Sequence, residues 1–407
     1  MAWRDLALAG ATAAEDRFDA LKRHLASRVG TPDPVQVLPY RDFGTAGRLE
    51  LCGRVLEDEG GPTQGRDDSL WFNVLATWRR LESDEVPGAR VVARLGGRSW
   101  EAVSDREGYV RWTIEPPPEV AAAVAGGGWV DVEVEIAELP GDMLRRHGLA
   151  HGGRAVGEVL VPSPAARFAV VSDLDDTIVE TGATKKLVMA RNTFLRNAHT
   201  RLPFEGVGAF YRALARGGGA GGPNPVFYVS SSPWNLYDLL RDFLSLHGLP
   251  DGPLLLRDLG LDRTRLLAGS HDDHKLAQIR RVLETYPHLP LILLGDSGQR
   301  DPEIYRRVVE EHPGRVLAVY LRDVTRTKGR SAEIADLWRE AVEGGVEMVL
   351  AEDTVAAAES AAARGWIAAE EVDRVREDRA RDHAAPEPEK AAVEAGVSGE
   401  GAGQAGR

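Results

Sequence analysis

The sequence contains almost no cysteine, no excess of positive charge and no long apolar run. Its single cysteine, Cys52, excludes an internal disulfide and a zinc site built from several thiolates, and it favours a reducing compartment. The 63 acidic residues outnumber the 50 basic ones, and the net charge of −13 argues against nucleic-acid binding driven by phosphate neutralisation. We therefore expect a cytoplasmic protein without a nucleic-acid partner.

No stretch of 18 apolar residues occurs, and the first residues lack a basic region followed by an apolar core. Both observations argue against a transmembrane segment and a secretory signal. The length of 407 residues, with 43% hydrophobic and 28% charged residues, is typical of a globular chain with two domains and a tail.

Residues 1–30 are expected to hold an amphipathic helix, because apolar residues from Phe18 to Val29 recur at helical spacing. One interpretation of its basic residues is peripheral contact with an anionic membrane surface. Asp16 and Asp19 dilute the positive charge, so packing against the next domain is the favoured interpretation.

Residues 31–160 show short runs in which apolar residues alternate with polar ones, for example at 48–56 and 129–136. Turn-rich segments separate these runs, and the pattern predicts an antiparallel β-sandwich-like domain. Four tryptophans are expected in its core rather than on a ligand-stacking surface: Trp71, Trp78, Trp100 and Trp112.

Residues 161–330 change to fully apolar strands separated by helical stretches, which is typical of a parallel sheet with crossover helices. The predicted strands lie at 168–172, 226–229, 254–256, 291–294 and 316–320. The predicted helices lie at 187–196, 206–215, 236–246, 275–286 and 302–311. A helical extension over 331–383 and a disordered tail over 384–407 are expected to follow.

The first candidate catalytic residues follow the predicted strand 168–172. Asp173 and Asp175 come directly after this apolar run, although aspartate is a poor strand residue. Carboxyl ends of parallel strands form the ligand crevice of such a sheet, so both carboxylates are expected to face it. The first can attack phosphorus or bind a cation, while the second carries a proton. A turn with a purely structural role is the alternative.

The predicted strand 291–294 also ends in acids. Gly295 gives the backbone room to bend, and Asp296 is then a natural third oxygen ligand beside Asp173 and Asp175. A hard cation such as Mg2+ prefers one to three carboxylates together with waters and phosphate oxygens. The two strand ends therefore predict a magnesium site.

Two further residues could contact a phosphoryl group. Ser230 is the first polar residue after the strand 226–229, and it could donate to a phosphoryl oxygen while Ser232 lies nearer the cap of the next helix. Lys275 opens an apolar-periodic helix and could neutralise charge on the transferring group, although a lysine on a helix is usually solvated.

Two segments are interpreted as having no chemical role. Gly217–Gly222 lacks the lysine and hydroxyl residue of a phosphate-binding loop and precedes a strand, so a flexible connector is expected. His271 and His274 have no third histidine nearby, which disfavours a transition-metal site. They are expected to shape a loop that presents Lys275.

These motifs occur in the order found in a known superfamily. The spacing of Asp173-x-Asp175-x-Thr177, followed by Ser230, Lys275 and Gly295-Asp296 with Asp301, resembles the haloacid-dehalogenase superfamily of aspartyl phosphotransferases. Four longer segments are similar to the actin-patch-associated phosphatidate phosphatase family: 172–178, 232–237, 295–305 and 320–324. The resemblance covers residues 167–325.

The resemblance implies that Asp173 forms an aspartyl-phosphate and that Asp175 protonates the leaving oxygen and later activates water. The implied ligands of Mg2+ are an Asp173 oxygen, the Asp175 backbone carbonyl, Asp296 and, through water, Asp301. The residues implied to hold the phosphoryl oxygens are Ser230 and Lys275. The implied fold is α/β, a Rossmann-like parallel sheet with a small cap, preceded here by the sandwich-like domain.

The resemblance implies a Mg2+-dependent phosphomonoesterase, with phosphatidate or another lipid phosphate as its specific substrate. Only the short insert 185–200 could cover the site, so the crevice is expected to be open, which suits a bulky or membrane-held substrate. One alternative is a phosphatase of a soluble or nucleic-acid phosphate. Another is a catalytically vestigial scaffold at a membrane, against which the complete set of motif residues argues.

Overall fold

The computed structural model describes residues 34–57, 85–141, 143, 153–174, 205–219, 221–257, 271–324 and 328–384. They form two compact units that divide after Val161. Several predicted features lie outside the described residues: the amphipathic helix of 1–30, Trp71 and Trp78, the insert 185–200 with its helix, and all but the first residue of the tail. The predicted domain boundaries stay predictions.

The first unit is a sheet of eight strands, in which the pairing is antiparallel except between β2 and β8. The strands are β1 Val35–Pro39, β2 Asp42–Thr45, β3 Arg48–Glu57, β4 Arg90–Leu95, β5 Arg98–Val103, β6 Tyr109–Ile114, β7 Gly128–Glu138 and β8 Arg154–Val161. A short helix, α3 (Pro118–Ala123), connects β6 to β7.

Alternation of apolar and polar residues explains how this sheet forms. Along β7, buried Val130, Val132 and Val134 alternate with exposed acids, so one face of the strand packs on the core and the other meets water. Trp112 is buried in the same core and Trp100 packs against it, as predicted for both. Valine and aromatic residues on the inner face suit a half-buried pleated sheet.

The second unit contains a parallel sheet of six strands in the order β11-β10-β9-β12-β13-β14. The strands are β9 Ala169–Asp173, β10 Val226–Pro233, β11 Leu254–Arg257, β12 Leu291–Asp296, β13 Val316–Arg322 and β14 Glu347–Ala351. All eight residues of β10 are buried, because helices cover both faces of the sheet.

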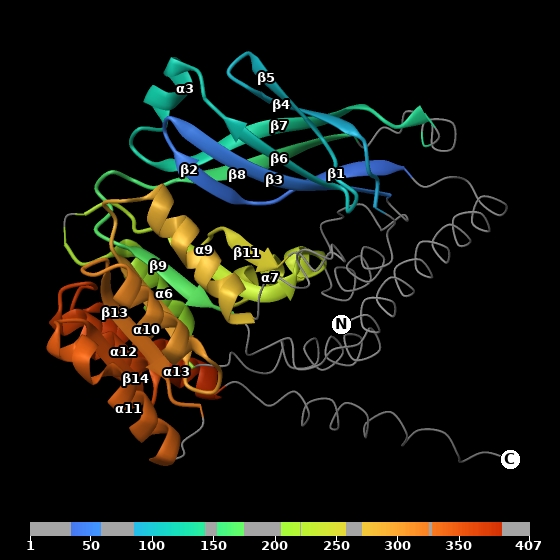
Figure 1. Cartoon of the computed structure of the whole chain (residues 1–407). Helices are drawn as coiled ribbons and strands as arrows, with labels where there is room; N and C mark the ends of the chain where they lie inside the picture. The colour runs from blue at the N-terminus through green and yellow to red at the C-terminus, as the bar shows by residue number, and fades with distance from the viewer. Residues whose placement is uncertain are drawn as a thin grey trace, which may run out of the picture. The chain divides into compact units, whose positions relative to one another are not determined.

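Helices lie on the two faces of this sheet, as Figure 1 shows. They are α6 Val207–Arg216, α7 Tyr237–Leu246 with the preceding 3-10 turn Trp234–Leu236, α9 His271–Thr285, α10 Asp301–Glu311, α11 Lys328–Glu343, α12 Thr354–Ala363 and α13 Glu371–Ala384. Helices α9, α10 and α11 pack side by side on one face, whereas α6, α12 and α13 pack together on the other. This confirms the predicted α/β class with a parallel and an antiparallel sheet.

The sixth strand of the parallel sheet is a correction to the predicted helical extension. Residues 331–383 contain helices, as expected, but β14 pairs with β13 and extends the sheet. The segment is five residues long, begins with Glu347 and is only half-buried at four of its positions. Residues 348–351 are all apolar, as in the predicted strands, so the sequence carried a strand signal here that the prediction of a helical extension missed.

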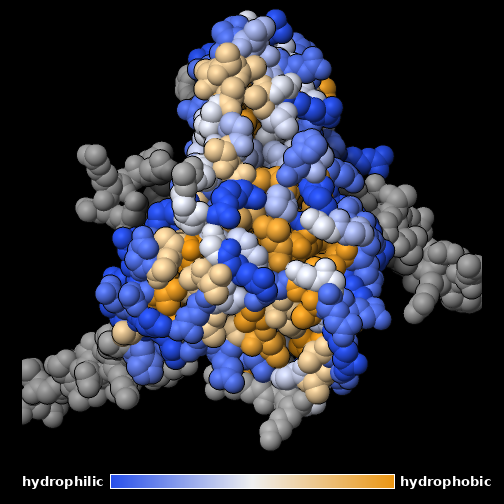
Figure 2. Space-filling view, turned by 90° about the vertical axis from the view of Figure 1, so that its left-hand side faces the viewer, coloured by the Kyte–Doolittle hydropathy of each residue, from blue (hydrophilic) through white to orange (hydrophobic). Residues whose placement is uncertain are grey.

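The surface is not uniformly polar. Figure 2 shows one face on which apolar residues gather in a patch bordered by hydrophilic residues. Within the part of the chain that the structure describes, no helix is long and apolar enough to cross a membrane.

Candidate active site

The carboxyl ends of three adjacent strands bring the predicted polar residues to one edge of the parallel sheet. Strand β9 lies between β10 and β12. Asp173, the last residue of β9, pairs in register with Val229, while Leu294 pairs with the residue before Asp173. Ser230 and Asp296 therefore follow at the same edge, which is where ligands bind in open parallel sheets.

Three carboxylates lie close enough together to hold one metal ion. Oxygen atoms of Asp173, Asp296 and Asp301 all lie within 4.8 Å of one another. The side chain of Asp173 is 3% exposed, and Asp296 and Asp301 are 5% and 0% exposed. Hard oxygen donors at this spacing fit Mg2+, and burial makes an uncompensated cluster of this kind costly. The remaining predicted ligand, Asp175, lies outside the described residues.

The ammonium group of Lys275 lies between two of these carboxylates. Its Nζ is 2.8 Å from Oδ1 of Asp173 and 2.9 Å from Oδ1 of Asp301, and it donates to Oε1 of Gln299 at 3.3 Å. The lysine side chain is 3% exposed, so it is a buried residue and not the solvated helix lysine of the alternative interpretation. Three carboxylates and one ammonium leave an excess of negative charge among these four side chains.

The prediction of a loop before Lys275 is wrong, because helix α9 begins at His271 and places Lys275 in its second turn. Asp272 and Asp273 occupy the first turn, where the helix dipole favours negative charge, and Asp272 pairs with Arg300 at 2.8 Å. The candidate metal cluster of the described residues contains no histidine. The two histidines thus belong to the start of the helix that carries the lysine.

Gly295 allows Asp301 to approach the end of β12. A Cβ added at Gly295 would collide with Oδ2 of Asp301 and lie 2.9 Å from Cε2 of Tyr305. The same Oδ2 accepts a hydrogen bond of 3.2 Å from the backbone N–H of Asp296. The glycine is therefore needed for a close approach between two elements, whereas the sequence suggested only a bend.

Hydrogen bonds within the next loop fix the Asp296 carboxylate. Its Oδ1 accepts from the N–H groups of Gly298 at 2.7 Å and Gln299 at 3.0 Å. Arg330 of α11 donates to the carbonyls of Ser297 and Gln299 at 3.3 and 3.2 Å. A residue from the C-terminal part of the unit therefore holds the loop that orients a candidate metal ligand.

Ser230 is fully buried within β10. Its Oγ accepts a hydrogen bond of 3.0 Å from the N–H of Ser232. The prediction that a serine caps the next helix is wrong for the described residues. Strand β10 continues through Pro233, and this proline is the N-cap residue of the 3-10 turn Trp234–Leu236, where no side chain makes a capping hydrogen bond. The register with β11 shifts between Val229 and Pro233, so the three serines lie in an irregular part of the strand before pairing resumes at Pro233.

The residue before Asp173 is tied to a tyrosine on α6. Ser172 Oγ donates to the backbone carbonyl of Asp173 at 3.1 Å and lies 2.7 Å from the hydroxyl of Tyr211. Since the single serine hydrogen points at the carbonyl, the tyrosine hydroxyl is the donor in the second bond. Burial raises the pKa of Tyr211 to about 12, which keeps this donor protonated at neutral pH.

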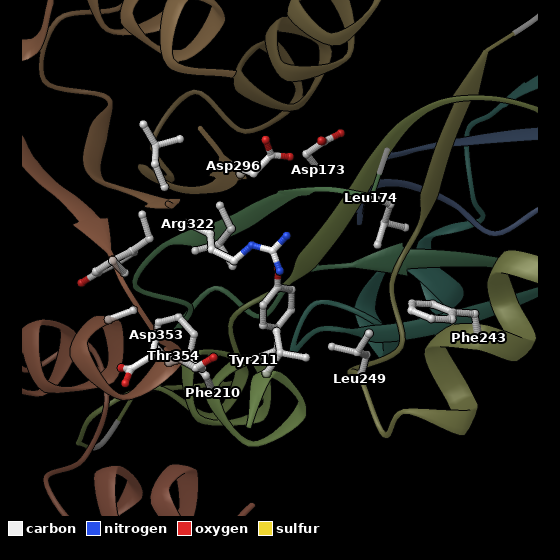
Figure 3. A pocket seen from close by; sticks show the side chains of 17 residues that line it. Asp173, Leu174, Phe210, Tyr211, Phe243, Leu249, Asp296, Arg322, Asp353 and Thr354 are labelled. Carbon is white, nitrogen blue, oxygen red and sulfur yellow. The ribbon is translucent and has the colours of Figure 1, made fainter. Parts of the chain in front are cut away.

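A cavity of about 120 Å³ opens beside Asp173 and Asp296. Its lining includes the apolar or aromatic residues Leu174, Val207, Phe210, Tyr211, Phe243, Leu249, Leu294, Tyr320, Leu321, Ala351 and Ala357. Figure 3 shows the two carboxylates at one side of the cavity, the side chain of Arg322 beside them and Phe243 with Leu249 at the other side. The cavity thus joins an acidic end to an apolar one.

The sequence interpretation missed Tyr211 and Arg322 as residues of this site. Arg322 is the last residue of β13 and pairs in register with Asp296. The rule that polar residues at strand ends face the crevice could have identified the arginine. No comparable signal marks Tyr211, which lies within the amphipathic helix α6 and reaches the site only through packing.

A family model described as phosphatidate phosphatase APP1, catalytic domain, matches residues 168–323. Residues 168–323 belong to this family. The family predicted from the motifs is confirmed. This family segment includes four clustered residues that the structure describes: Asp173, Lys275, Asp296 and Asp301.

Two curated relatives match a part of the chain of about the same length as the family segment. Phosphatidate phosphatase APP1 of Saccharomyces cerevisiae is 31% identical over 156 residues, which cover 38% of this chain and 26% of the relative. An uncharacterized protein of Schizosaccharomyces pombe is 24% identical over 158 residues, 39% of this chain and 25% of the relative. The chain thus spans about a quarter of the length of these relatives.

Among solved structures, a carbohydrate acetylesterase from Xanthomonas citri aligns with 75% of this chain and 73% of its own, at 10% identity and a TM-score of 0.24. A similarity this low carries no argument about fold or function.

Proposed function

We propose that the chain is a Mg2+-dependent phosphomonoesterase that forms an aspartyl-phosphate on Asp173. The observation that carries the proposal is the buried cluster of Asp173, Asp296, Asp301 and Lys275 at the carboxyl end of the parallel sheet, within the family segment. We also propose that the sheet is of the haloacid-dehalogenase type and that the insert 185–200 is its small cap.

The donor set of the cluster fits Mg2+, because it consists of carboxylate oxygens at a spacing that one small cation can span. Asp173, Asp296, the backbone carbonyl of Asp175 and, through water, Asp301 would hold the ion. When bound, Mg2+ supplies neutralisation of the charge on the phosphoryl oxygens.

In the first chemical step, a carboxylate oxygen of Asp173 bonds to phosphorus as the bond from phosphorus to the ester oxygen breaks. Asp175 gives its proton to the leaving oxygen, so an alcohol departs. In the second step, water gives a proton to Asp175 and bonds to phosphorus, while the bond to Asp173 breaks and phosphate is released. Each residue regains its initial state.

Ser230 and Lys275 are proposed to hold the phosphoryl oxygens during both steps. Lys275 lies 2.8 Å from the proposed nucleophile, so a phosphoryl group attached to Asp173 would lie within reach of the ammonium. The ion pair with Asp301 fixes the lysine in that position.

Phosphatidate is the proposed substrate, on the strength of similarity to a phosphatidate phosphatase and of the apolar cavity beside the carboxylates. A membrane lipid requires contact with a bilayer surface. We propose a cytoplasmic protein; for a peripheral contact with the membrane, the helix expected in residues 1–30 is the candidate segment, although packing against the next domain is the favoured interpretation of that helix.

The test is a panel of phosphate-release assays on the full chain at a single Mg2+ concentration. The panel contains phosphatidate in mixed micelles, nucleotides, sugar phosphates and an oligonucleotide with a terminal phosphate. The Asp173→Asn variant should lose at least about 10⁴-fold in rate while its melting temperature is retained. Asp336→Asn, an exposed position on α11, is the matched control and should keep full activity.

Retained activity in Asp173→Asn would refute the mechanism. A preference for nucleotides or sugar phosphates would leave the mechanism in place and refute the lipid substrate. If the wild type released phosphate from no compound, the vestigial scaffold would replace the enzyme.

A second test concerns the metal. Asp296→Ala should raise the Mg2+ concentration needed for half-maximal activity or abolish activity, because one of three clustered oxygen ligands is lost. A metal titration that superimposes on the wild-type curve would show that Asp296 is not a ligand.

A further inference from the structure

The C-terminal helix α13 lies outside the family segment but contacts a helix that supports Asp173. The family segment ends at residue 323, whereas α13 spans Glu371–Ala384 and packs against α6 on one face of the parallel sheet (Figure 1). Helix α6 carries Tyr211, whose hydroxyl bonds to Ser172 beside Asp173. A change in α13 can therefore reach Asp173 through a single intervening helix.

Helix α6 has no capping side chain of its own. Its N-cap residue is Gly206, which has no side chain to accept from the free N–H groups of the first turn. Asp382 of α13 accepts a hydrogen bond of 2.7 Å from the N–H of Gly206, and Asp378 accepts one of 2.9 Å from the N–H of Ala209. Two carboxylates of α13 thus cap α6, at the end where the helix dipole favours negative charge.

The backbones of the two helices also approach closely at this end. Gly206 has a φ of 80°, and a Cβ added there would lie 2.9 Å from the backbone carbonyl oxygen of Val375 and 3.2 Å from Cβ of Arg379. Val375 is completely buried. A larger residue than glycine would force the start of α6 away from α13.

The carboxylate of Asp378 also binds a side chain of α6. Arg212 donates from one nitrogen to Asp378 at 3.3 Å and from another to the carbonyl of Gly248 at 2.6 Å. Gly248 precedes Leu249, which lines the cavity beside Asp173. The side chain of Asp378 is only 15% exposed. One acid of α13 therefore fixes two points of α6 and, through Arg212, the loop that follows α7.

The position of α6 decides whether Tyr211 can hold the end of β9. Tyr211 follows Ala209 by two residues and donates to Oγ of Ser172 at 2.7 Å, while Ser172 donates to the carbonyl of Asp173 at 3.1 Å. Bonds between two oxygens need a separation of about 2.5–3.0 Å, so a shift of α6 by about 1 Å would break the first of them.

We infer that Asp378 and Asp382 are positioning residues of the reaction: by capping α6 they hold Tyr211 against Ser172 and thereby fix the backbone at Asp173. The inference rests on the proposed function, which makes Asp173 the nucleophile. It adds that catalysis requires α13, so the functional unit extends beyond the family segment to residue 384.

The experiment measures phosphate release by the full chain with Mg2+ and phosphatidate in mixed micelles, or with the fastest substrate of the panel above if that differs. Asp378→Ala should lower kcat by about fivefold, the loss expected when the Tyr211 hydroxyl is removed. In the Tyr211→Phe background the same substitution should have no further effect on kcat, because the hydroxyl through which it acts is gone. Asp378→Asn keeps an oxygen that can accept from Ala209 and should restore at least about half of the wild-type kcat.

The matched control on the same helix is Asp373→Ala. The side chain of Asp373 is 75% exposed and pairs with Arg376 within α13, so kcat should stay at the wild-type value. If Asp378→Ala fails to fold, as judged by its melting temperature, Asp382→Ala removes the other cap and should show the same dependence on the Tyr211 hydroxyl.

Hydrogen exchange separates this inference from the proposed function. The first turn of α6 and residues 172–174 should exchange faster in Asp378→Ala than in the wild type, and at the wild-type rate in Asp373→Ala. Full kcat in Asp378→Ala, or an equal loss with and without the Tyr211 hydroxyl, overturns the inference and leaves the phosphatase in place. A wild type that releases no phosphate refutes the proposed reaction, whereas these exchange changes would still support the fixing of β9 by α13.

Discussion

The two sheets of this protein place charged residues in opposite ways. In the antiparallel sheet, ion pairs lie on the exposed face, as in the pair formed by Arg90 of β4 and Glu138 of β7, which are 39% and 66% exposed, although Asp42 and Arg54 are buried. In the parallel sheet, both faces are covered, and the charges of Asp173, Asp301 and Lys275 are 3% exposed or less.

The exposed charges of the antiparallel sheet keep the surface hydrated, whereas the buried charges of the parallel sheet lie at the candidate active site. An exposed ion pair stays hydrated and contributes little to stability, whereas a buried charge loses its hydration and depends on its partners. A fold tolerates buried carboxylates at a sheet edge where a cation or a substrate can compensate them, which is why such clusters often mark functional sites. Four substitutions test the comparison.

The largest effect is expected from removing the buried cation. Lys275→Met leaves Asp173 and Asp301 without their shared ammonium, so the free energy of unfolding without metal should fall by about 3–5 kcal/mol. Mg2+ should restore part of the loss, because it neutralises the same carboxylates. Denaturant titrations with and without Mg2+ measure both effects.

The matched control is Arg307→Met on α10, which removes an exposed ion pair of 2.8 Å with Glu311. Its cost should be about 0–1 kcal/mol and independent of Mg2+. Similar losses for the two variants would contradict the distinction between buried and exposed charge.

A smaller effect is expected from crowding the cluster. Gly295→Ala places a methyl group against the carboxylate of Asp301, and overpacking of this kind costs about 1–3 kcal/mol. Phosphate release should fall with stability, because a candidate metal ligand is displaced. Gly329→Ala on α11, where an added Cβ meets nothing within 4 Å, should instead leave stability unchanged or raise it by about 0.4–1 kcal/mol. Equal melting temperatures for the two variants would show that the site tolerates the shift.

Removing the hydroxyl donor behind Asp173 should have a moderate effect. Tyr211→Phe deletes the bond of 2.7 Å to Ser172, so stability should fall by about 1 kcal/mol and kcat by about fivefold. Because Tyr211 acts through Ser172, the combination with Ser172→Ala should cost less than the sum of the single variants. Additive losses in kcat would mean that the tyrosine does not position Asp173 through the serine.

The smallest effect is expected on the antiparallel sheet. Glu158→Gln removes the ion pair of 2.7 Å between Glu158 and Arg41. The side chain of Arg41 is 18% exposed, and that of Glu158 is 33% exposed. The cost should be about 0.2–1 kcal/mol and should shrink in high salt, while phosphate release stays at the wild-type rate. A loss of activity in this variant would connect the antiparallel unit to catalysis.

The strands of the parallel sheet were largely predictable, because a central strand must be apolar throughout and this leaves a local signal. The predicted runs 168–172, 226–229, 254–256, 291–294 and 316–320 all lie within or overlap observed strands. Strand β14 was missed although its residues 348–351 are all apolar, because a short apolar run between helical stretches fits a buried helix as well as a strand, and only the pairing with β13 decides between them.

The sequence by itself determined which residues could carry the chemistry: acids directly after apolar strands, and a lysine at the start of an apolar-periodic helix. Only the tertiary structure decided that Asp173, Asp296, Asp301 and Lys275 share one buried cluster, that Tyr211 supports it and that an apolar cavity opens beside it. The physical reason is that strand composition is a local property, whereas the approach of side chains more than a hundred residues apart depends on sheet order, register and helix packing.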